Sequence, residues 1–369
     1  MSKIELITLH RVKNYGSVLQ AYATQEMLIK LGHSVEVIDY YPERYTMFGM
    51  LKRIKNQNKY LRKSFFLRVV ARIVIIPSYF LRFRTFNNFI KKNLNLTSKV
   101  YKDIDDLEKY LPNADIYVTG SDQVWNSEWN GGIDRCLYLD IDSIKRKIAY
   151  AASFGKSSLA EDEKNATLAL LKKYNAISLR EQSGVEICNE LGINNTINVL
   201  DPTLLLDSNA WKKLSSNKFK GEEYILVYNL NRNRKIDNYA KNLSVKTGLK
   251  VKYLSYQLHE AFKNGKMYCN PKVEDFLALI ENAKYVITDS FHATAFSINF
   301  EKNFVIVYPG KYSTRLQSIL KILGLENRVA KDDNDLEITL SIINYTEVNK
   351  KLKIERKKSL DWLSKSLTE

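Results

Sequence analysis

The chain has 369 residues, a length that suits two domains of about 150–200 residues each. Its hydrophobic content of 45% and aromatic content of 11% exclude the disordered, collagen-like and coiled-coil classes. The cysteines Cys136, Cys188 and Cys269 lie far apart without a C-x-x-C pair, so the sequence predicts no disulfide framework and no metal site. The opening MSKIELITLH is typical of a strand and not of a signal peptide, and we therefore expect a cytoplasmic protein.

The formal net charge of +16 comes from one segment, residues 44–102. It holds 15 of the 57 basic residues and none of the 41 acidic ones, so the rest of the chain is close to neutral. Its longest uncharged run, Ile73–Leu81, is shorter than the roughly 20 apolar residues that cross a bilayer. The pattern predicts a basic amphipathic helix or helical hairpin, either docked peripherally on the anionic inner face of the cell membrane or packed on its own domain. No motif that reads nucleic acid accompanies it, so we expect no nucleic-acid partner.

In the first half of the chain, short β-branched runs alternate with helical periodicity. Strands are predicted at Ile4–Leu9, Ser34–Asp39, Asp115–Thr119, Lys147–Ala152 and Ala176–Leu179. Helices are predicted at Val18–Leu31, Glu161–Lys173 and Gln182–Leu191.

The second half repeats this alternation. Strands are predicted at Tyr224–Tyr228, Val251–Leu254, Tyr285–Thr288 and Phe304–Val307, and helices at Ile236–Thr247, Val273–Asn282, Phe291–Asn299 and 344–366. Such alternation predicts an α/β fold in which two Rossmann-like domains with parallel sheets face each other across a cleft. The Asp201-Pro202 pair suggests the seam, because the residue before proline avoids helical geometry. We therefore expect domains at 1–203, on the acceptor side of the cleft, and at 204–369, on the donor side.

Two polar loops follow predicted strands of the first domain, where open α/β sheets bind ligands. The first, residues 10–17, contains Asn14, Tyr15 and Gly16 and resembles a phosphate-binding loop only weakly; a tight turn explains it equally well. The second, residues 119–126, contains Ser121, Asp122, Gln123 and Asn126, which suit a ligand rich in hydroxyl groups. Its alternative is a helix cap with Trp125 in the core.

Two further loops present groups that bind anions or transfer protons. Arg180 ends a strand and offers a bidentate grip on carboxylate or phosphate, unless it forms an ordinary surface ion pair with Glu181 or a neighbour. His292 lies in the first turn of a helix that Asp289 or Ser290 can cap, where free N–H groups favour anions. The helix end lowers the pKa of this histidine, and a bound polyanion would raise it again, which makes His292 a candidate acid. The alternative is a structural histidine.

Together and in this order, several segments resemble the polysaccharide pyruvyl transferase family. The matching segments are NYGSVLQAYA at 14–23, GSDQVWN at 120–126, SLRE at 178–181, DPTLLL at 201–206, TDSFH at 288–292, and RLQSIL at 315–320 followed by LGL at 323–325. The likeness extends to about residue 330, and the basic segment is its least similar part.

The resemblance implies a fold like that of GT-B glycosyltransferases and transfer of a pyruvyl group from phosphoenolpyruvate, as a substrate with no further cofactor, onto hydroxyls of a saccharide. Such acceptors are precursors of capsule, exopolysaccharide or cell-wall polymers, often linked to undecaprenyl diphosphate. By the same resemblance, His292 is the acid and Arg180 a ligand of the donor, with Lys311 and Arg315 as further cations.

This sequence departs from the family pattern, because Ser290 stands where an Arg of the donor site is usual and Ala293 stands where Gly is usual. One donor-binding cation is therefore absent or supplied from elsewhere. Two alternatives stay open: a GT-B glycosyltransferase that uses a nucleotide sugar, and a non-catalytic protein that binds sugar or lipid within a polysaccharide assembly system.

Overall fold

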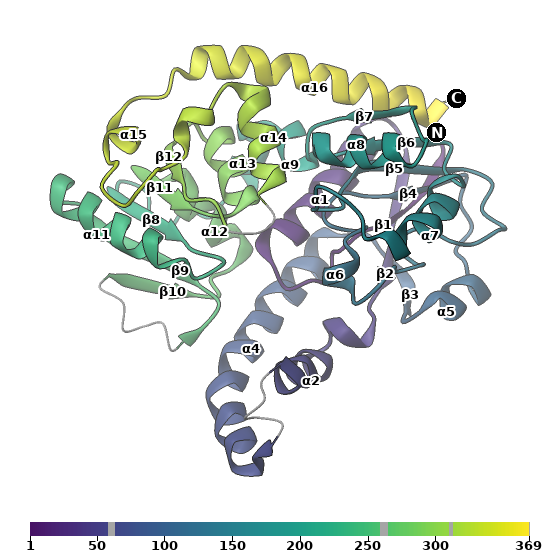
Figure 1. Ribbon diagram of the computed structural model, residues 1–369, viewed down its shortest axis with the longest axis horizontal. Helices are drawn as coiled ribbons and strands as arrows, with labels where there is room; N and C mark the ends of the chain where they lie inside the picture. The colour runs from purple at the N-terminus through teal and green to yellow at the C-terminus, as the bar shows by residue number, and fades with distance from the viewer. Residues whose placement is uncertain (58–62, 259–264, 310–312, 369) are drawn as a thin grey trace.

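The computed structural model describes residues 1–57, 63–258, 265–309 and 313–368, and they form two α/β domains (Figure 1). The first domain contains a parallel seven-stranded sheet in the order β3-β2-β1-β4-β5-β6-β7. Its strands are β1 (Lys3–Ile7), β2 (Ser34–Tyr40), β3 (Leu96–Tyr101), β4 (Ile116–Thr119), β5 (Lys147–Ala152), β6 (Ala176–Leu179) and β7 (Thr196–Asn198).

The second domain contains a parallel five-stranded sheet in the order β10-β9-β8-β11-β12. Its strands are β8 (Tyr224–Tyr228), β9 (Lys250–Ser255), β10 (Lys266–Cys269), β11 (Tyr285–Thr288) and β12 (Asn303–Ile306). In each sheet the chain reverses its direction of winding at the first strand, between β1 and β4 and between β8 and β11. The carboxyl ends of these strand pairs are where open sheets bind ligands.

Helices connect the strands in both domains. Those of the first half are α1 (Tyr15–Lys30), α2 (Met47–Gln57), α4 (Phe65–Asn93), α5 (Ile104–Lys109), α6 (Ser127–Asn130), α7 (Glu161–Leu171), α8 (Gln182–Glu190), α9 (Pro202–Leu205) and α10 (Ser208–Leu214). Those of the second half are α11 (Arg234–Thr247), α12 (Val273–Glu281), α13 (Phe291–Asn299), α14 (Thr314–Leu323), α15 (Glu337–Leu340) and α16 (Tyr345–Thr368).

The prediction of two Rossmann-like domains is confirmed, and the strands that the sequence indicated are present with shifts of one or two residues. The sequence analysis missed β3, β7 and β10, because edge strands need no continuous apolar run. β3 alternates exposed and buried residues, and β7 is only three residues long.

The two domains share a hydrophobic core. One cluster of buried side chains contains both Leu6 of β1 and Leu226 of β8. Tyr15, at the start of α1, inserts into the second domain, where its ring stacks on Phe276 at 4.4 Å and its hydroxyl donates to the carbonyl of Pro271 at 2.7 Å. The long helix α16 lies across both domains (Figure 1). Its Ser359 lies at the seam, where the hydroxyl oxygen accepts the Leu200 N–H at 3.0 Å.

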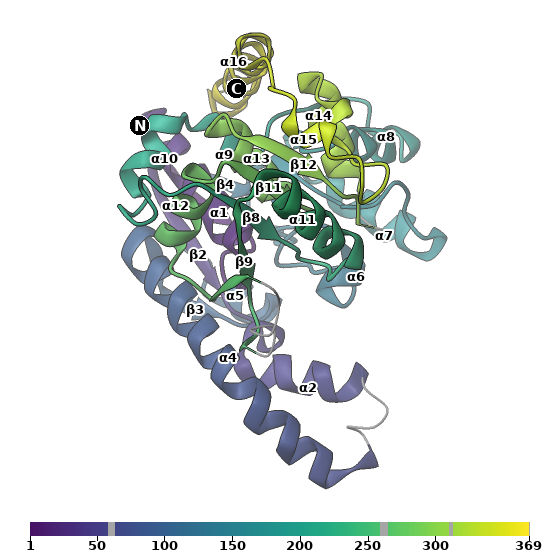
Figure 2. The ribbon, with the colours of Figure 1, turned by 90° about the vertical axis from the view of Figure 1, so that its left-hand side faces the viewer.

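The basic segment forms a helical hairpin of α2 and α4 that extends away from both domains (Figures 1 and 2). The C-terminal half of α4 anchors it, because Phe86, Phe89 and Ile90 are buried in the core of the first domain. The N-terminal half of α4 and α2 form the protruding end. None of the helices in the described part of the chain has the length and hydropathy needed to cross a membrane.

Candidate active site

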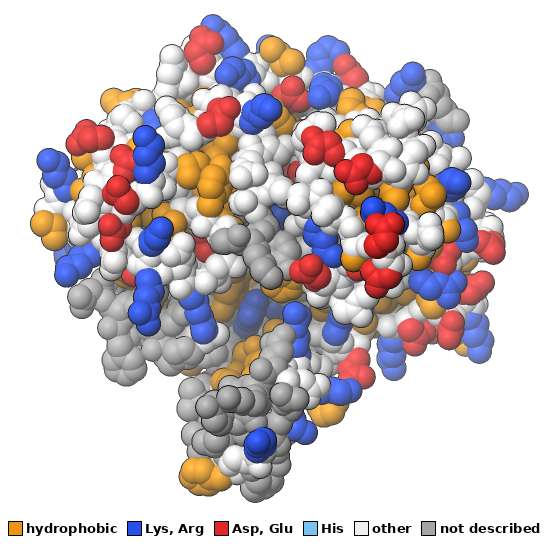
Figure 3. Space-filling model, in the orientation of Figure 1, with side chains coloured by type: hydrophobic (Ala, Val, Ile, Leu, Met, Phe, Trp, Pro, Cys, Tyr) orange, Lys and Arg blue, Asp and Glu red, His pale blue; other side chains and the backbone are white. Residues whose placement is uncertain are grey.

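A cavity of about 650 Å³ lies where the carboxyl ends of the two sheets meet the hairpin. Its walls come from the loops after β1, β4, β8 and β11, from the start of α14, and from α2 and α4. Figure 3 shows Lys and Arg side chains around the recess between the two domains and the hairpin. The cations that line the cavity are Arg11, Lys13, Arg44, Arg53, Arg82, Arg232 and Arg315.

His292 lines this cavity from the first turn of α13. Ser290 caps that helix, since its hydroxyl oxygen accepts the Ala293 N–H at 3.4 Å. The imidazole packs directly on Gly16 of α1, so closely that a Cβ on Gly16 would lie 1.9 Å from His292 Nδ1. The Nε2 atom is buried, has no hydrogen-bond partner among the described residues, and lies 3.8 Å from Asp201 Oδ2.

The surroundings of His292 keep it neutral in the free protein. Burial lowers the pKa of His292 to about 4, while the charges of Asp201 and Asp122 oppose this shift. The direction agrees with the sequence analysis, but the cause is burial and not the end of the helix alone. An anion bound beside the ring would raise this pKa and allow His292 to donate a proton.

Arg180 lies behind the cavity wall and not in it. Its Nη1 donates to Asp201 Oδ2 at 2.9 Å and its Nη2 lies 3.4 Å from Asp122 Oδ1. Although burial alone would lower the pKa of Arg180, the charges of Asp201 and Asp122 raise it. The guanidinium is thus neutralised by carboxylates. This placement differs from the open anion ligand that we expected and agrees with the ion-pair alternative, except that the ion pairs are buried and not on the surface.

Arg315 has the opposite environment. It lies in the first turn of α14, half-buried in the cavity wall, and its Nε is buried without a hydrogen-bond partner among the described residues. Burial, and then the charge of Arg180, lower the pKa of Arg315 to about 10. A guanidinium held in this way favours an anionic ligand as its counter-charge. Lys311, the other cation expected here, lies outside the described residues.

A second group of cations lies on the hairpin side of the cavity. Lys13 is buried, donates to Asn87 Oδ1 at 2.8 Å, and has its pKa lowered to about 7 by burial and then by the charge of Arg11. Arg82 of α4 donates to the Lys13 carbonyl at 2.7 Å and lies 4.0 Å from the centre of the Tyr256 ring. Arg11 is paired with Asp39, so Arg82 is the charge of this group that is available to a ligand, and Lys13 joins it when it is protonated.

Of the remaining predicted residues, some line the cavity and others hold the residues around it in place. Asn14, Asp122 and Gln123 line the cavity; Asn14 also caps α1 by accepting the Gly16 N–H at 2.9 Å. Support residues are Tyr15, Ser121 and Asn126: Tyr15 is buried between the domains, the Ser121 hydroxyl donates to Asp201 at 3.0 Å, and Asn126 caps α6 and donates to Gln123 Oε1 at 2.8 Å. The alternative for this loop was a helix cap at Ser121 or Asp122 with Trp125 in the core; Trp125 is in the core, but the cap is Asn126.

The sequence analysis missed the roles of two aspartates. Asp201 faces His292 and binds Arg180, whereas in the sequence it was only an Asp before a helix-initiating proline, within the DPTLLL segment of the family resemblance. Asp289 accepts the N–H groups of Leu230 at 2.7 Å and Asn231 at 2.9 Å, and so fixes the loop after β8 against the start of α13. In the described part of the chain, no three His, Cys, Asp or Glu side chains are grouped as a metal ion would require.

Two solved structures share the fold of this chain with a TM-score above 0.5. One is AviGT4, a glycosyltransferase involved in avilamycin A biosynthesis, with a TM-score of 0.52, 10% identity, and coverage of 100% of this chain and 99% of that chain. Another is the S. aureus MnaA–UDP co-structure, with a TM-score of 0.51, 10% identity, and coverage of 99% and 91%. At this identity the likeness shows the fold alone, and it confirms the expected GT-B-like architecture.

In sequence, no curated protein matches the chain. The sequence model of the family described as polysaccharide pyruvyl transferase matches residues 14–311, which covers most of the chain. The matched region includes Asp201, Arg180 and His292, but ends just before Arg315.

Proposed function

The chain belongs to the polysaccharide pyruvyl transferase family, and we propose that it transfers the pyruvyl group of phosphoenolpyruvate onto two hydroxyls of a saccharide as a cyclic ketal. The product would be a precursor of capsule, exopolysaccharide or cell-wall polymer. The observation that supports this most directly is the buried His292, whose Nε2 has no hydrogen-bond partner among the described residues, close to Arg315, a cation that forms no salt bridge with a described carboxylate. A proton donor next to an anion site is the minimum that this donor requires.

We place the carboxylate and phosphate of the donor against Arg315, Ser290 and the first turn of α13, the helix that Ser290 caps. The free N–H groups at the start of this nine-residue helix favour an anion. The family resemblance implies Lys311, which lies outside the described residues, as a further cation of the donor site. Arg180 then acts indirectly, because it neutralises Asp201 and Asp122 and holds them in place.

His292 transfers the proton that ketal formation requires and is regenerated in the reaction. The anionic donor raises the pKa of His292, so the imidazolium protonates the methylene carbon of phosphoenolpyruvate and leaves an oxocarbenium-like centre at C2. The first sugar hydroxyl attacks C2 and returns its proton to the imidazole. The C2–O bond to phosphate then breaks, the second hydroxyl attacks C2 to close the ring, and its proton leaves with the phosphate.

The acceptor would enter from the side of the first domain and the hairpin. Asn14, Asp122 and Gln123 provide hydrogen-bonding groups for sugar hydroxyls there. Lys13 and Arg82 provide positive charge that suits an acceptor carrying phosphate, such as a saccharide linked to undecaprenyl diphosphate.

Titration calorimetry with phosphoenolpyruvate and with a panel of nucleotide sugars, each without acceptor, tests the donor. We expect phosphoenolpyruvate alone to bind, and the pKa of His292, followed by NMR of the labelled imidazole, to rise from about 4 when it does. His292→Gln should keep donor binding and abolish phosphate release with acceptor. Binding of a nucleotide sugar alone would instead indicate a glycosyltransferase. If none of these donors binds, the non-catalytic alternative is favoured.

A further inference from the structure

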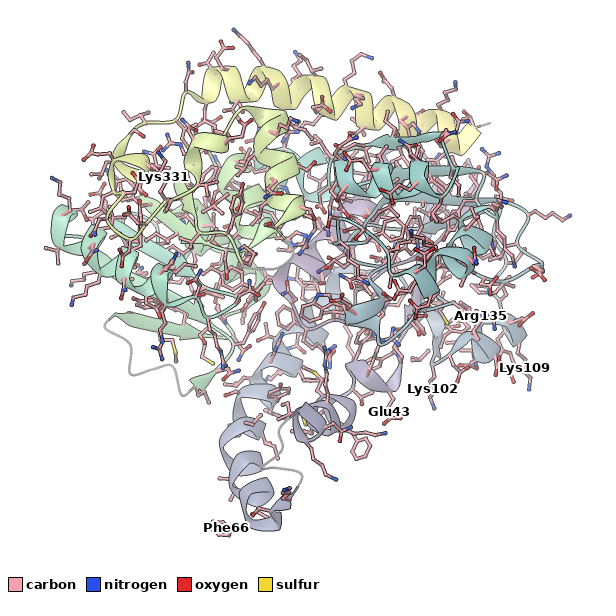
Figure 4. All side chains as sticks on the ribbon, in the orientation of Figure 1. Glu43, Phe66, Lys102, Lys109, Arg135 and Lys331 are labelled. Carbon is pink, nitrogen blue, oxygen red and sulfur yellow. The ribbon has the colours of Figure 1, made fainter. Side chains whose placement is uncertain are left out.

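One face of α4 presents a row of exposed apolar side chains to solvent. The row consists of Phe66, Val69, Ile73, Ile76 and Phe80, whose side chains are 72%, 37%, 69%, 38% and 57% exposed. Their spacing of three and four residues places them on one side of a helix. Figure 4 shows Phe66 at the far end of the hairpin, remote from both sheets. Contiguous apolar surface of this kind usually marks an interaction site.

The charge around this apolar row has a single sign. Residues 44–102 contain no Asp or Glu, and the hairpin's exposed cations include Arg53, Lys55, Lys63 and Arg84. Lys52 is exposed as well, but it is paired with Glu43 at 3.2 Å, just outside the segment. The protruding end therefore combines apolar side chains with positive charge and contains no acidic residue of its own.

These features discriminate between two occupants of the row. A second copy of the chain would bring two acid-free, positively charged hairpins together, whereas paired helices usually place opposite charges beside their apolar seam. An anionic bilayer surface offers an apolar region for the apolar side chains and negatively charged headgroups for the cations. Since no described helix can cross a membrane, the hairpin would lie in the interface and not span it.

We propose that the end of the hairpin, α2 together with residues 63–81, docks on an anionic membrane with the apolar row inserted at the boundary of the acyl chains. The cations of the hairpin then lie among the lipid phosphates. The same two helices line the cavity through Met50, Arg53 and Tyr79, so docking holds the cavity mouth close to the bilayer. An acceptor with a lipid tail could reach the cavity without leaving the membrane. The docking itself does not depend on the donor or on pyruvyl transfer.

Co-sedimentation of the full chain with vesicles tests this proposal without any activity measurement. The vesicles contain phosphatidylglycerol and phosphatidylcholine in equal parts, or phosphatidylcholine alone. The test variant is Phe66→Ser/Ile73→Ser/Phe80→Ser. The matched control is Val245→Ser/Ile342→Ser/Ile354→Ser, because these residues are as exposed, at 80%, 85% and 66%, but lie in the second domain and α16. All six side chains are exposed, so both variants should keep the thermal unfolding midpoint of the wild type.

We expect the wild type to bind the anionic vesicles, more weakly in high salt and on neutral vesicles, and the test variant to bind at least about tenfold more weakly than the control. Failure of the wild type to bind at low salt would overturn the proposal. Binding that the test variant retains in full would also overturn it, because adsorption would then be electrostatic only. A dimer detected by light scattering and abolished in the test variant, without vesicle binding, would assign the row to a second copy instead.

Discussion

The contact between Gly16 and His292 predicts that even a methyl group at position 16 will disturb the site. In Gly16→Ala, the new Cβ would lie 1.9 Å from His292 Nδ1, 2.3 Å from Cγ and 2.5 Å from Cε1. Ordinary van der Waals contacts of a Cβ begin at 3.4 Å. The imidazole cannot remain in place, so it must move by more than 1 Å or α1 must shift.

The size of the effect follows from two opposing contributions. Overpacking a close contact costs typically about 1–3 kcal/mol. Replacing glycine by alanine inside a helix returns about 1 kcal/mol of helix propensity, somewhat less in a first turn such as that of α1. We therefore expect Gly16→Ala to lower the free energy of unfolding by about 1–2 kcal/mol, and to reduce turnover by about 100-fold because His292 is displaced by an ångström or more.

A double-mutant cycle isolates this contact. Urea denaturation would be followed for Gly16→Ala, His292→Ala and the double variant, with Gly184→Ala as the control. Gly184 also lies in the first turn of a helix, but there a Cβ meets only the Leu179 side chain, at 3.1 Å. Without the imidazole, Gly16→Ala should be neutral or stabilising. If its cost is the same in the His292→Ala background, the contact with His292 does not explain it and the reasoning fails.

Three further predictions concern the charges around the cavity. Asp201→Asn leaves Arg180 without the carboxylate at 2.9 Å, and urea denaturation should show a loss of about 3–5 kcal/mol; a loss under 1 kcal/mol would contradict this. The pKa of His292 falls from 6.5 to about 4 on folding, so the free energy of unfolding of the wild type should fall by up to about 3 kcal/mol as the pH is lowered through that interval. His292→Gln should lose less over the same interval. Equal dependence of stability on pH in the two proteins would contradict this prediction. Arg315→Gln should weaken phosphoenolpyruvate binding by about 10–100-fold in calorimetry. It should not lower the free energy of unfolding, because Arg315 forms no salt bridge with a described carboxylate that the substitution would break. Unchanged affinity would exclude Arg315 from the donor site.

The fold could be predicted in those parts where burial alone decides the sequence. β5 and β8 are buried along their whole length, so, apart from the buried Lys147 that begins β5, their sequences are continuous apolar runs that no helix period explains. β10 is an edge strand with no fully buried residue, and its four residues have no such pattern. Edge strands form because a neighbouring strand offers hydrogen bonds, and that information lies in the neighbour and not in the strand itself.

The hairpin shows a second limit of the same kind. Its charge and helical character were evident from the sequence, but the sequence did not show which of its arginines are exposed to solvent and which bind other parts of the protein. Arg82 donates to the Lys13 carbonyl and lies on Tyr256, 174 positions further along the chain, whereas Arg84 is exposed. Two residues on one helix, separated by half a turn, thus have unrelated roles.

At the site, the comparison of Arg180 with Arg315 shows why a cation's role cannot be inferred from its position after a strand or before a helix. Both arginines point towards the region of His292, and both were expected to bind the donor. Arg180 meets Asp122 and Asp201, which are 58 and 21 positions away, and is neutralised by them. Arg315 forms no salt bridge with a described carboxylate, and it is the arginine that we propose as a ligand of the donor. What distinguishes a structural arginine from a binding one is therefore its set of counter-charges, which only the folded chain brings together.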